Sequence, residues 1–199
     1  MYPDLDRAGA ETEAPARSIC IPTPWLATWV LVVLVALAFA LRAVGLDTQS
    51  LWRDEVDALR FAGRSLSELL AMFRQPGQNG PLYYLFLRPW LAVAGTSEFS
   101  LRYFSTVCGV LAVALIYRLG RRLFASRWVP VVATLLAVTS AYLVWYAQEG
   151  KMYSLVVLLA LASTESYVVA LRRGGGRRWL AYVLLTTAAF YVHLVAAAL

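Results

Sequence analysis

Residues 25–44 read WLATWVLVVLVALAFALRAV, a run of 20 residues in which the only charge is Arg42, near the end. A membrane-spanning helix needs about 20 largely apolar residues. Four further stretches of this kind follow, at residues 101–119, 128–146, 152–171 and 179–199. We expect Arg42 to extend its guanidinium toward the membrane surface, as arginines near span ends do. The pattern predicts an all-α fold, a polytopic transmembrane helical bundle of about five spans.

The composition supports a membrane protein. Of the 199 residues, 60% are hydrophobic and only 15% are charged, whereas soluble domains are about 45–50% apolar and about 25% charged. The net charge of +6 comes from arginines in loops, so it indicates topology and gives no reason to expect a nucleic-acid partner. The last apolar run is still open at Leu199, and we therefore expect the N-terminal part of a longer protein.

The arginines predict the orientation in the membrane. Residues 118–127 and 172–178 each carry four arginines and no acid, whereas residues 147–151 are nearly neutral. Positively charged loops stay in the cytoplasm. This rule predicts a cytoplasmic tail over residues 1–24, followed by a membrane module over residues 25–199. Residues 47–100 and the loop at 147–151 would then be extracytoplasmic, and the membrane is expected to be the plasma membrane.

The large outer segment is predicted to hold helices that lie on the membrane. Residues 81–95 are apolar, but 15 residues of helix would reach only about 22 Å, short of the roughly 30 Å hydrocarbon core. We expect an interfacial or re-entrant helix there. A second helix is expected over residues 51–62. The Ser65–Glu68 pattern is typical of a capping box, and it precedes an apolar stripe at residues 66, 69, 70 and 73.

This topology collects reactive side chains on the outer face. Asp54 and Glu55 begin the first outer helix, and Glu149 with Lys151 lies in a loop on the same side. Tyr153 and His193 are also near it, since His193 lies about 22 Å along the fifth stretch from Arg178. Structural alternatives are a solvated helix start for Asp54 and Glu55, an ion pair between Glu149 and Lys151, and a packing histidine.

An acid inside a predicted span points to a function by default. Glu165 is such an acid, and its expected role is a contact between helices with a neighbouring serine or threonine. A non-catalytic transporter or an envelope-assembly scaffold stays open as an alternative, because transporters carry charges along a path through the membrane. The sequence contains no phosphate-binding loop, dinucleotide fingerprint or zinc-ligand spacing.

Five segments in order resemble one known family: LWRDE at 51–55, GPLYY at 80–84, GTSEFSLR at 95–102, YRLGRRLF at 117–124 and WYAQEGKMYSL at 145–155. They are similar to the GT-C membrane glycosyltransferases, such as protein O-mannosyltransferases and lipid A aminoarabinose transferases. The resemblance implies a polyprenyl-phosphate sugar as donor and transfer at the extracytoplasmic face. It also implies that Asp54 is catalytic and that Glu149 is the second outer-loop acid. Lys151 stands where many relatives have arginine.

The resemblance and the residues together predict an inverting hexosyl or pentosyl transferase. Asp54 is expected to deprotonate the acceptor hydroxyl. Glu55 is expected to position the acceptor or the loop, and Glu149 to orient the acceptor. Lys151 and Arg102 are the expected cations for the donor phosphate, and Tyr153 and His193 are expected to bind substrate. A divalent metal ion at Glu149 is compatible with this scheme and not required by it. The acceptor is expected to be a lipid, a glycan or a protein.

Overall fold

The computed structural model describes residues 24–75 and 80–198. Every regular element within these residues is helical, which confirms the predicted all-α bundle. Nearly all of the predicted cytoplasmic tail lies outside the described residues.

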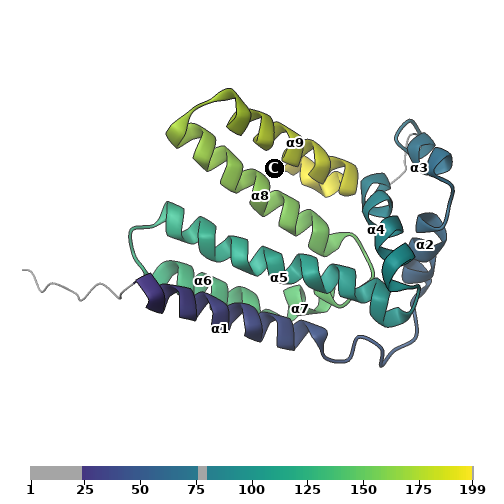
Figure 1. Ribbon diagram of the computed structural model, residues 1–199, viewed down its shortest axis with the longest axis horizontal. Coiled ribbons are helices and arrows are strands. Elements are labelled where there is room, and N and C mark those ends of the chain that lie inside the picture. Colours follow the sequence, from purple (N-terminus) through teal and green to yellow (C-terminus); the bar gives the residue numbers. More distant parts are fainter. Residues whose placement is uncertain (1–23, 76–79, 199) are drawn as a thin grey trace, which may run out of the picture.

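Three long helices form the body of the bundle (Figure 1): α1 (Pro24–Ala43), α5 (Glu98–Leu123) and α8 (Tyr153–Arg173). Each is long and apolar enough to cross a membrane. The α5 helix is central, because it packs against α1 and α8 and also against the two short helices that follow it. Serine and threonine side chains along α5 donate to backbone carbonyls of neighbouring segments, which fixes those segments around it.

The third and fifth predicted spans differ from the expectation. The third is broken into α6 (Trp128–Thr139) and α7 (Ala141–Ala147), which are bent by 59°. The Ser140 hydroxyl accepts a hydrogen bond from the Leu143 N–H and so starts a new helix. The fifth is the 17-residue α9 (Gly176–Val192), which ends at an extended His193 and is followed by the 3-10 helix η1 (Leu194–Ala198). The described residues thus hold three such spans, or four with the bent pair, instead of about five.

Three shorter helices gather at one end of the bundle (Figure 1): α2 (Arg53–Ala62), α3 (Leu66–Met72) and α4 (Pro81–Ala94). The capping box is confirmed, because the Ser65 N–H donates to Glu68 and the Glu68 N–H donates to the Ser65 hydroxyl. The predicted apolar stripe is only partly right. Leu69 is buried together with Met72, whereas Leu66 and Leu70 remain exposed.

Arg42 does not extend toward the membrane surface as expected. Its side chain is 1% exposed, and its guanidinium donates to the carbonyls of Ala38, Ala137 and Val138. The bend between α6 and α7 frees the last carbonyls of α6, because they lose their partners in the next helical turn. Arg42 therefore joins α1 to the broken span.

Candidate active site at the outer loops

Two segments far apart in the sequence meet beside α4 and α5. The first is the start of α2, and the second is the loop that joins α7 to α8. The Lys151 Nζ lies 3.7 Å from the Asp54 Oδ2. The Asp54 side chain is 72% exposed and that of Lys151 is 14% exposed. A carboxylate open to solvent therefore lies next to a largely buried cation.

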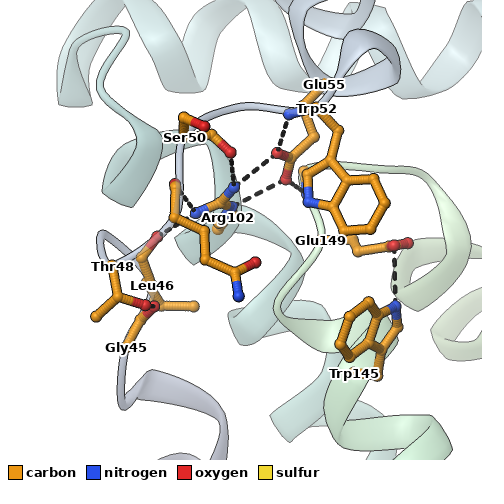
Figure 2. A network of polar contacts seen from close by, with 11 residues as sticks. Gly45, Leu46, Thr48, Ser50, Trp52, Glu55, Arg102, Trp145 and Glu149 are labelled. Carbon is orange, nitrogen blue, oxygen red and sulfur yellow. Dashed lines mark hydrogen bonds and ion pairs between the residues drawn. The ribbon is translucent and has the colours of Figure 1, made fainter.

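Glu55, next in the sequence, is buried and faces Arg102 (Figure 2). Arg102 on α5 binds it through two parallel hydrogen bonds, from Nε to Oε1 at 2.9 Å and from one terminal nitrogen to Oε2 at 2.7 Å. Both side chains are at most 5% exposed. Paired bonds of this kind fix the relative orientation of the two groups. The Glu55–Arg102 pair thereby holds the start of α2 against α5.

Arg102 also holds the loop that connects α1 to α2. Its terminal nitrogens donate to the carbonyls of Leu46, Gln49 and Ser50, at 2.7, 2.8 and 3.2 Å. With the two bonds to Glu55, these contacts occupy every nitrogen of the guanidinium. The geometry of Arg102 therefore suits positioning of the loop better than contact with a substrate.

Gly150 completes this network from the second segment. Its N–H donates to the Glu55 Oε1 at 2.8 Å. A Cβ at this position would lie 2.5 Å from the Leu101 side chain, closer than real Cβ contacts allow. The glycine is required here because the backbone of the α7–α8 loop approaches α5 so closely. Since Lys151 follows Gly150, the same contact places the Lys151 ammonium beside Asp54.

The network shifts the pKa of Glu55. Burial by itself would raise the pKa of this carboxyl, but hydrogen bonds from Arg102, Gly150 and Trp52 outweigh burial. The net result is a pKa below the ordinary glutamate value, so Glu55 stays ionised in the folded protein. A paired, buried carboxylate is a poor proton acceptor, whereas the exposed carboxylate of Asp54 is accessible to a substrate.

Glu149 has a different environment from Glu55. Its Oε1 accepts a hydrogen bond from the Trp145 indole N–H at 3.0 Å (Figure 2). Burial raises the pKa of Glu149, and the nearby charges of Glu55 and Asp54 raise it further. The Trp145 hydrogen bond and the Lys151 charge oppose this shift without cancelling it, so the pKa of Glu149 moves in the direction opposite to that of Glu55.

Tyr153 and His193 lie on the far side of α7, where they line a cavity of about 280 Å3. Their ring centroids are 5.9 Å apart. The His193 Nδ1 accepts a hydrogen bond from the Val195 N–H, so the neutral imidazole carries its proton on Nε2. The cavity walls are otherwise mainly aliphatic and aromatic, with Ala112, Val113, Ile116, Tyr142, Leu143, Tyr146, Val156 and Val157 among them.

Four residues of the site were missed by the sequence analysis. Gly150 and Gln148 flank Glu149, and the Gln148 amide donates to the Val44 carbonyl at 2.9 Å, which ties the α7–α8 loop to the end of α1. Trp52 and Trp145 are in edge-to-face contact across the site. Trp52 lies two residues before Asp54, and this closeness to the acidic pair was the one signal that could have identified it.

The remaining candidate, Glu165, lies at the opposite end of the bundle. Its Oε1 accepts from the Nε atoms of Arg118 and Arg122, at 2.9 and 2.7 Å. The expected contact between helices is present, here between α8 and α5, but the expected serine or threonine partner is wrong, because the partners are arginines. Among the described residues, no group of three or more histidine, cysteine, aspartate or glutamate side chains could hold a metal ion. A divalent ion at Glu149 stays a prediction.

The fold and the site define a class of protein: an all-helical membrane bundle with an exposed carboxylate and a lysine held between its loops at one end. Such a class includes the membrane glycosyltransferases. The family model for dolichyl-phosphate-mannose-protein mannosyltransferases matches residues 76–199. The match covers more than half of the chain, and the chain therefore belongs to this family. Comparisons with curated proteins and with solved structures gave no match.

Proposed function

We propose that the chain transfers a sugar from a polyprenyl-phosphate donor to an acceptor hydroxyl at the extracytoplasmic face of the plasma membrane. The observation that carries this proposal is the pair formed by an exposed Asp54 and a largely buried Lys151, 3.7 Å apart. The matched region contains Lys151 and Glu149, and the Glu55–Arg102–Gly150 network holds Asp54 against it.

Asp54 acts as the general base in this proposal. Its carboxylate takes the proton of the acceptor hydroxyl while the hydroxyl oxygen forms a bond to the anomeric carbon of the donor. The bond from that carbon to the phosphate oxygen breaks, and the polyprenyl phosphate leaves with the electron pair. Attack from the side opposite the phosphate inverts the anomeric configuration. An ionised, accessible carboxylate within hydrogen-bond reach is what such a base requires.

Lys151 stabilises the negative charge that develops on the leaving phosphate. Cations placed where charge develops are effective because they need no rearrangement during the reaction. Tyr153 begins α8, just after Lys151, and His193 follows the end of α9. Both side chains line the neighbouring cavity. The His193 Nε2–H and the Tyr153 hydroxyl are donors for the phosphate, and the apolar walls of the cavity suit the isoprenoid chain.

Glu55 and Arg102 are positioning residues in this proposal. They do not contact the donor, because both are buried and bonded to each other and to the loop. Glu149 orients the acceptor through its free oxygen. The orientation of the chain follows from the two arginine-rich loops at the opposite end of the bundle, which the positive-inside rule places in the cytoplasm.

The transporter alternative rested on Glu165. The structure pairs this acid with two arginines, so it contributes a helix contact, and it supplies no argument for a transport path. The family match favours transfer chemistry over a scaffold role.

The test is a transfer assay in liposomes with purified protein, polyprenyl-phosphate mannose and a mixed pool of glycan and threonine-peptide acceptors. Asp54→Asn removes the base at nearly constant shape and is expected to lower turnover by about 10²–10⁴-fold. Lys151→Ala should lose activity while Lys151→Arg keeps most of it, because the positive charge remains. Asp57→Asn is the matched control, since Asp57 lies on the same helix and, within residues 24–75 and 80–198, forms an ion pair with Arg60 alone. Wild-type turnover of Asp54→Asn would refute the proposal.

A further inference from the structure

A second hollow includes in its lining Glu149, which orients the acceptor in the proposed function, and the positioning residues Glu55 and Arg102. It measures about 180 Å3 and is lined by ten residues: Val44, Gly45, Thr48, Gln49, Trp52, Glu55, Arg102, Trp145, Gln148 and Glu149. We call it the tryptophan pocket. Figure 2 shows that it lies between the loop that follows α1 and the α7–α8 loop. Pockets for drug-sized ligands are roughly 300–1,000 Å3, so this one suits a ligand of about one ring.

Two indole rings form one wall of the tryptophan pocket. Trp52 and Trp145 meet edge to face, with centroids 6.1 Å apart and an angle of 87° between the rings. Each side chain is 51% exposed, so each ring has a free surface. Tryptophans at a membrane surface commonly face lipid. These two instead border a polar hollow, and the Trp145 N–H is bound to a carboxylate.

Polar groups with unused hydrogen-bonding capacity form the opposite wall. Within the described part of the chain, Glu149 uses only Oε1, so Oε2 can accept a bond. The Gln49 side chain has no hydrogen bond with any described residue, and its amide offers two donors and an acceptor. The Thr48 hydroxyl donates to the Gly45 carbonyl and can still accept.

This combination matches the chemistry of a sugar ring. A pyranose presents flat patches of C–H groups, which pack on aromatic faces, and hydroxyls around its edge, which bind carboxylates and amides. Aromatic side chains with a few well-placed polar groups are what fixes small ligands in pockets. The lining holds two carboxylates, Glu55 and Glu149, and one guanidinium, Arg102, so its net charge is negative and disfavours an anionic ligand. The pocket therefore favours a neutral saccharide.

The position of the pocket separates it from the donor side. The tryptophan pocket and the apolar cavity share no lining residue. Helix α7 divides them, because Tyr142 and Tyr146 face the cavity and Trp145 faces the pocket. If the lipid-linked donor occupies the cavity, a second substrate in the pocket lies near Asp54, because the Asp54 charge acts on Glu149 in the pocket wall.

We propose that the tryptophan pocket binds a neutral pyranose of the acceptor, so that this enzyme extends a saccharide instead of modifying a serine or threonine of a peptide. This inference rests on the proposed function and specifies its acceptor.

The test measures binding directly, by saturation-transfer difference NMR on the full chain in lipid nanodiscs, since maltoside and glucoside detergents would compete. The probes are methyl α-D-mannopyranoside and an acetylated Ala-Thr-Ala amide. We expect the mannoside to bind and the peptide to bind more weakly. Trp52→Ala should weaken mannoside binding by about tenfold, equivalent to about 1.4 kcal/mol. Trp128→Ala is the control, because Trp128 is 63% exposed at the opposite end of the bundle. This variant should bind the mannoside as the wild type does.

Gln49→Ala is a second variant that should fold normally, because the Gln49 side chain makes no hydrogen bond with any described residue. Loss of one hydrogen bond to the sugar should weaken mannoside binding roughly two- to threefold. Addition of polyprenyl-phosphate mannose should leave mannoside binding intact. Competition between the two would assign the pocket to the donor sugar and overturn the acceptor assignment. Equal binding by wild type and Trp52→Ala, or no binding at all, would also overturn it.

The same probes, combined with the transfer assay, test the proposed function separately. Asp54→Asn should bind the mannoside normally and fail to transfer. If transfer to the threonine peptide depends on Asp54 while the mannoside does not bind, the function stands and the saccharide assignment fails.

Discussion

The two ends of this bundle each hold a carboxylate bound by arginine, and the two arrangements differ in a useful way. Following the proposed orientation, we call the end with Glu55 the outer end and the end with Glu165 the inner end. At the outer end, Glu55 uses both oxygens, one arginine binds it twice, and both side chains are at most 5% exposed. At the inner end, two arginines contact a single oxygen of Glu165. Those arginine side chains are 61% and 34% exposed.

This difference separates a network that fixes geometry from a contact that joins two helices. The outer pair also binds backbone groups of both loops, so a change in it moves Asp54 and Lys151. The inner contact joins only helix residues, from α5 and α8. If one of its two arginines is lost, the other still binds Glu165. We therefore expect substitutions at the outer end to affect stability and activity, and substitutions at the inner end to affect neither strongly.

The largest effect on stability is expected from Arg102→Ala. It leaves Glu55 buried without its partner, and breaking a buried pair in this way costs about 3–5 kcal/mol. Thermal unfolding of the purified protein, followed by circular dichroism, should show a markedly lower midpoint. Arg102→Lys should recover only part of the loss, because lysine cannot make the paired bonds. A wild-type midpoint for Arg102→Ala would mean that the outer pair does not hold the loops.

A smaller loss is expected from Gly150→Ala. The added methyl would meet the Leu101 side chain at about 2.5 Å, and overpacking of this kind costs about 1–3 kcal/mol. Turnover should fall as well, because the shift moves Lys151 away from Asp54. Gly176→Ala is the control, since a Cβ there would meet nothing within 4 Å. If the two variants had equal unfolding midpoints, the close approach described at Gly150 would be contradicted.

The pH dependence of stability should show opposite contributions from the two outer glutamates. Glu55 has a lowered pKa, so its contribution is complete above the ordinary glutamate pKa and is lost as the pH falls through its folded value. Glu149 has a raised pKa, so its ionisation reduces stability as the pH rises from the ordinary value through the raised one. Glu149→Gln should remove that second decline. Unfolding midpoints measured across pH 3–8 on wild type and Glu149→Gln would decide this, and parallel curves would refute it.

The smallest effect is expected from Arg118→Ala at the inner end. Arg122 still binds the same oxygen of Glu165, and exposed ion pairs contribute about 0–1 kcal/mol. Its unfolding midpoint should stay within a few degrees of wild type, measured beside Arg102→Ala. A loss as large as that of Arg102→Ala would remove the distinction between the two ends.

Helix positions were predictable because they follow from local pattern. The apolar runs, the capping box at Ser65 and the short length of residues 81–95 all led to the observed helices. The break at Ser140 was missed because residues 128–146 are uniformly apolar, and the serine is too small a signal within them. The end of α9 at His193 was missed for the same reason, since the run stays apolar to Leu199.

The site was only partly predictable. Topology correctly suggested that Asp54 and Lys151 share a face, because loops on the same side of a membrane can meet. It could not show that Arg102 binds Glu55, because a charged residue at the start of a span looks the same whether it binds protein or substrate. The close approach at Gly150 depends on three-dimensional packing, which no spacing in the sequence encodes.

The central claim is that Asp54 and Glu55, adjacent in the sequence, have different roles. The most direct test measures both turnover and unfolding midpoint for Asp54→Asn and Glu55→Gln in the same liposome preparation. We predict that Asp54→Asn loses about 10²–10⁴-fold in turnover with an unchanged midpoint, whereas Glu55→Gln lowers the midpoint and keeps more of its turnover. Wild-type turnover in Asp54→Asn, or an unchanged midpoint in Glu55→Gln, would contradict the account.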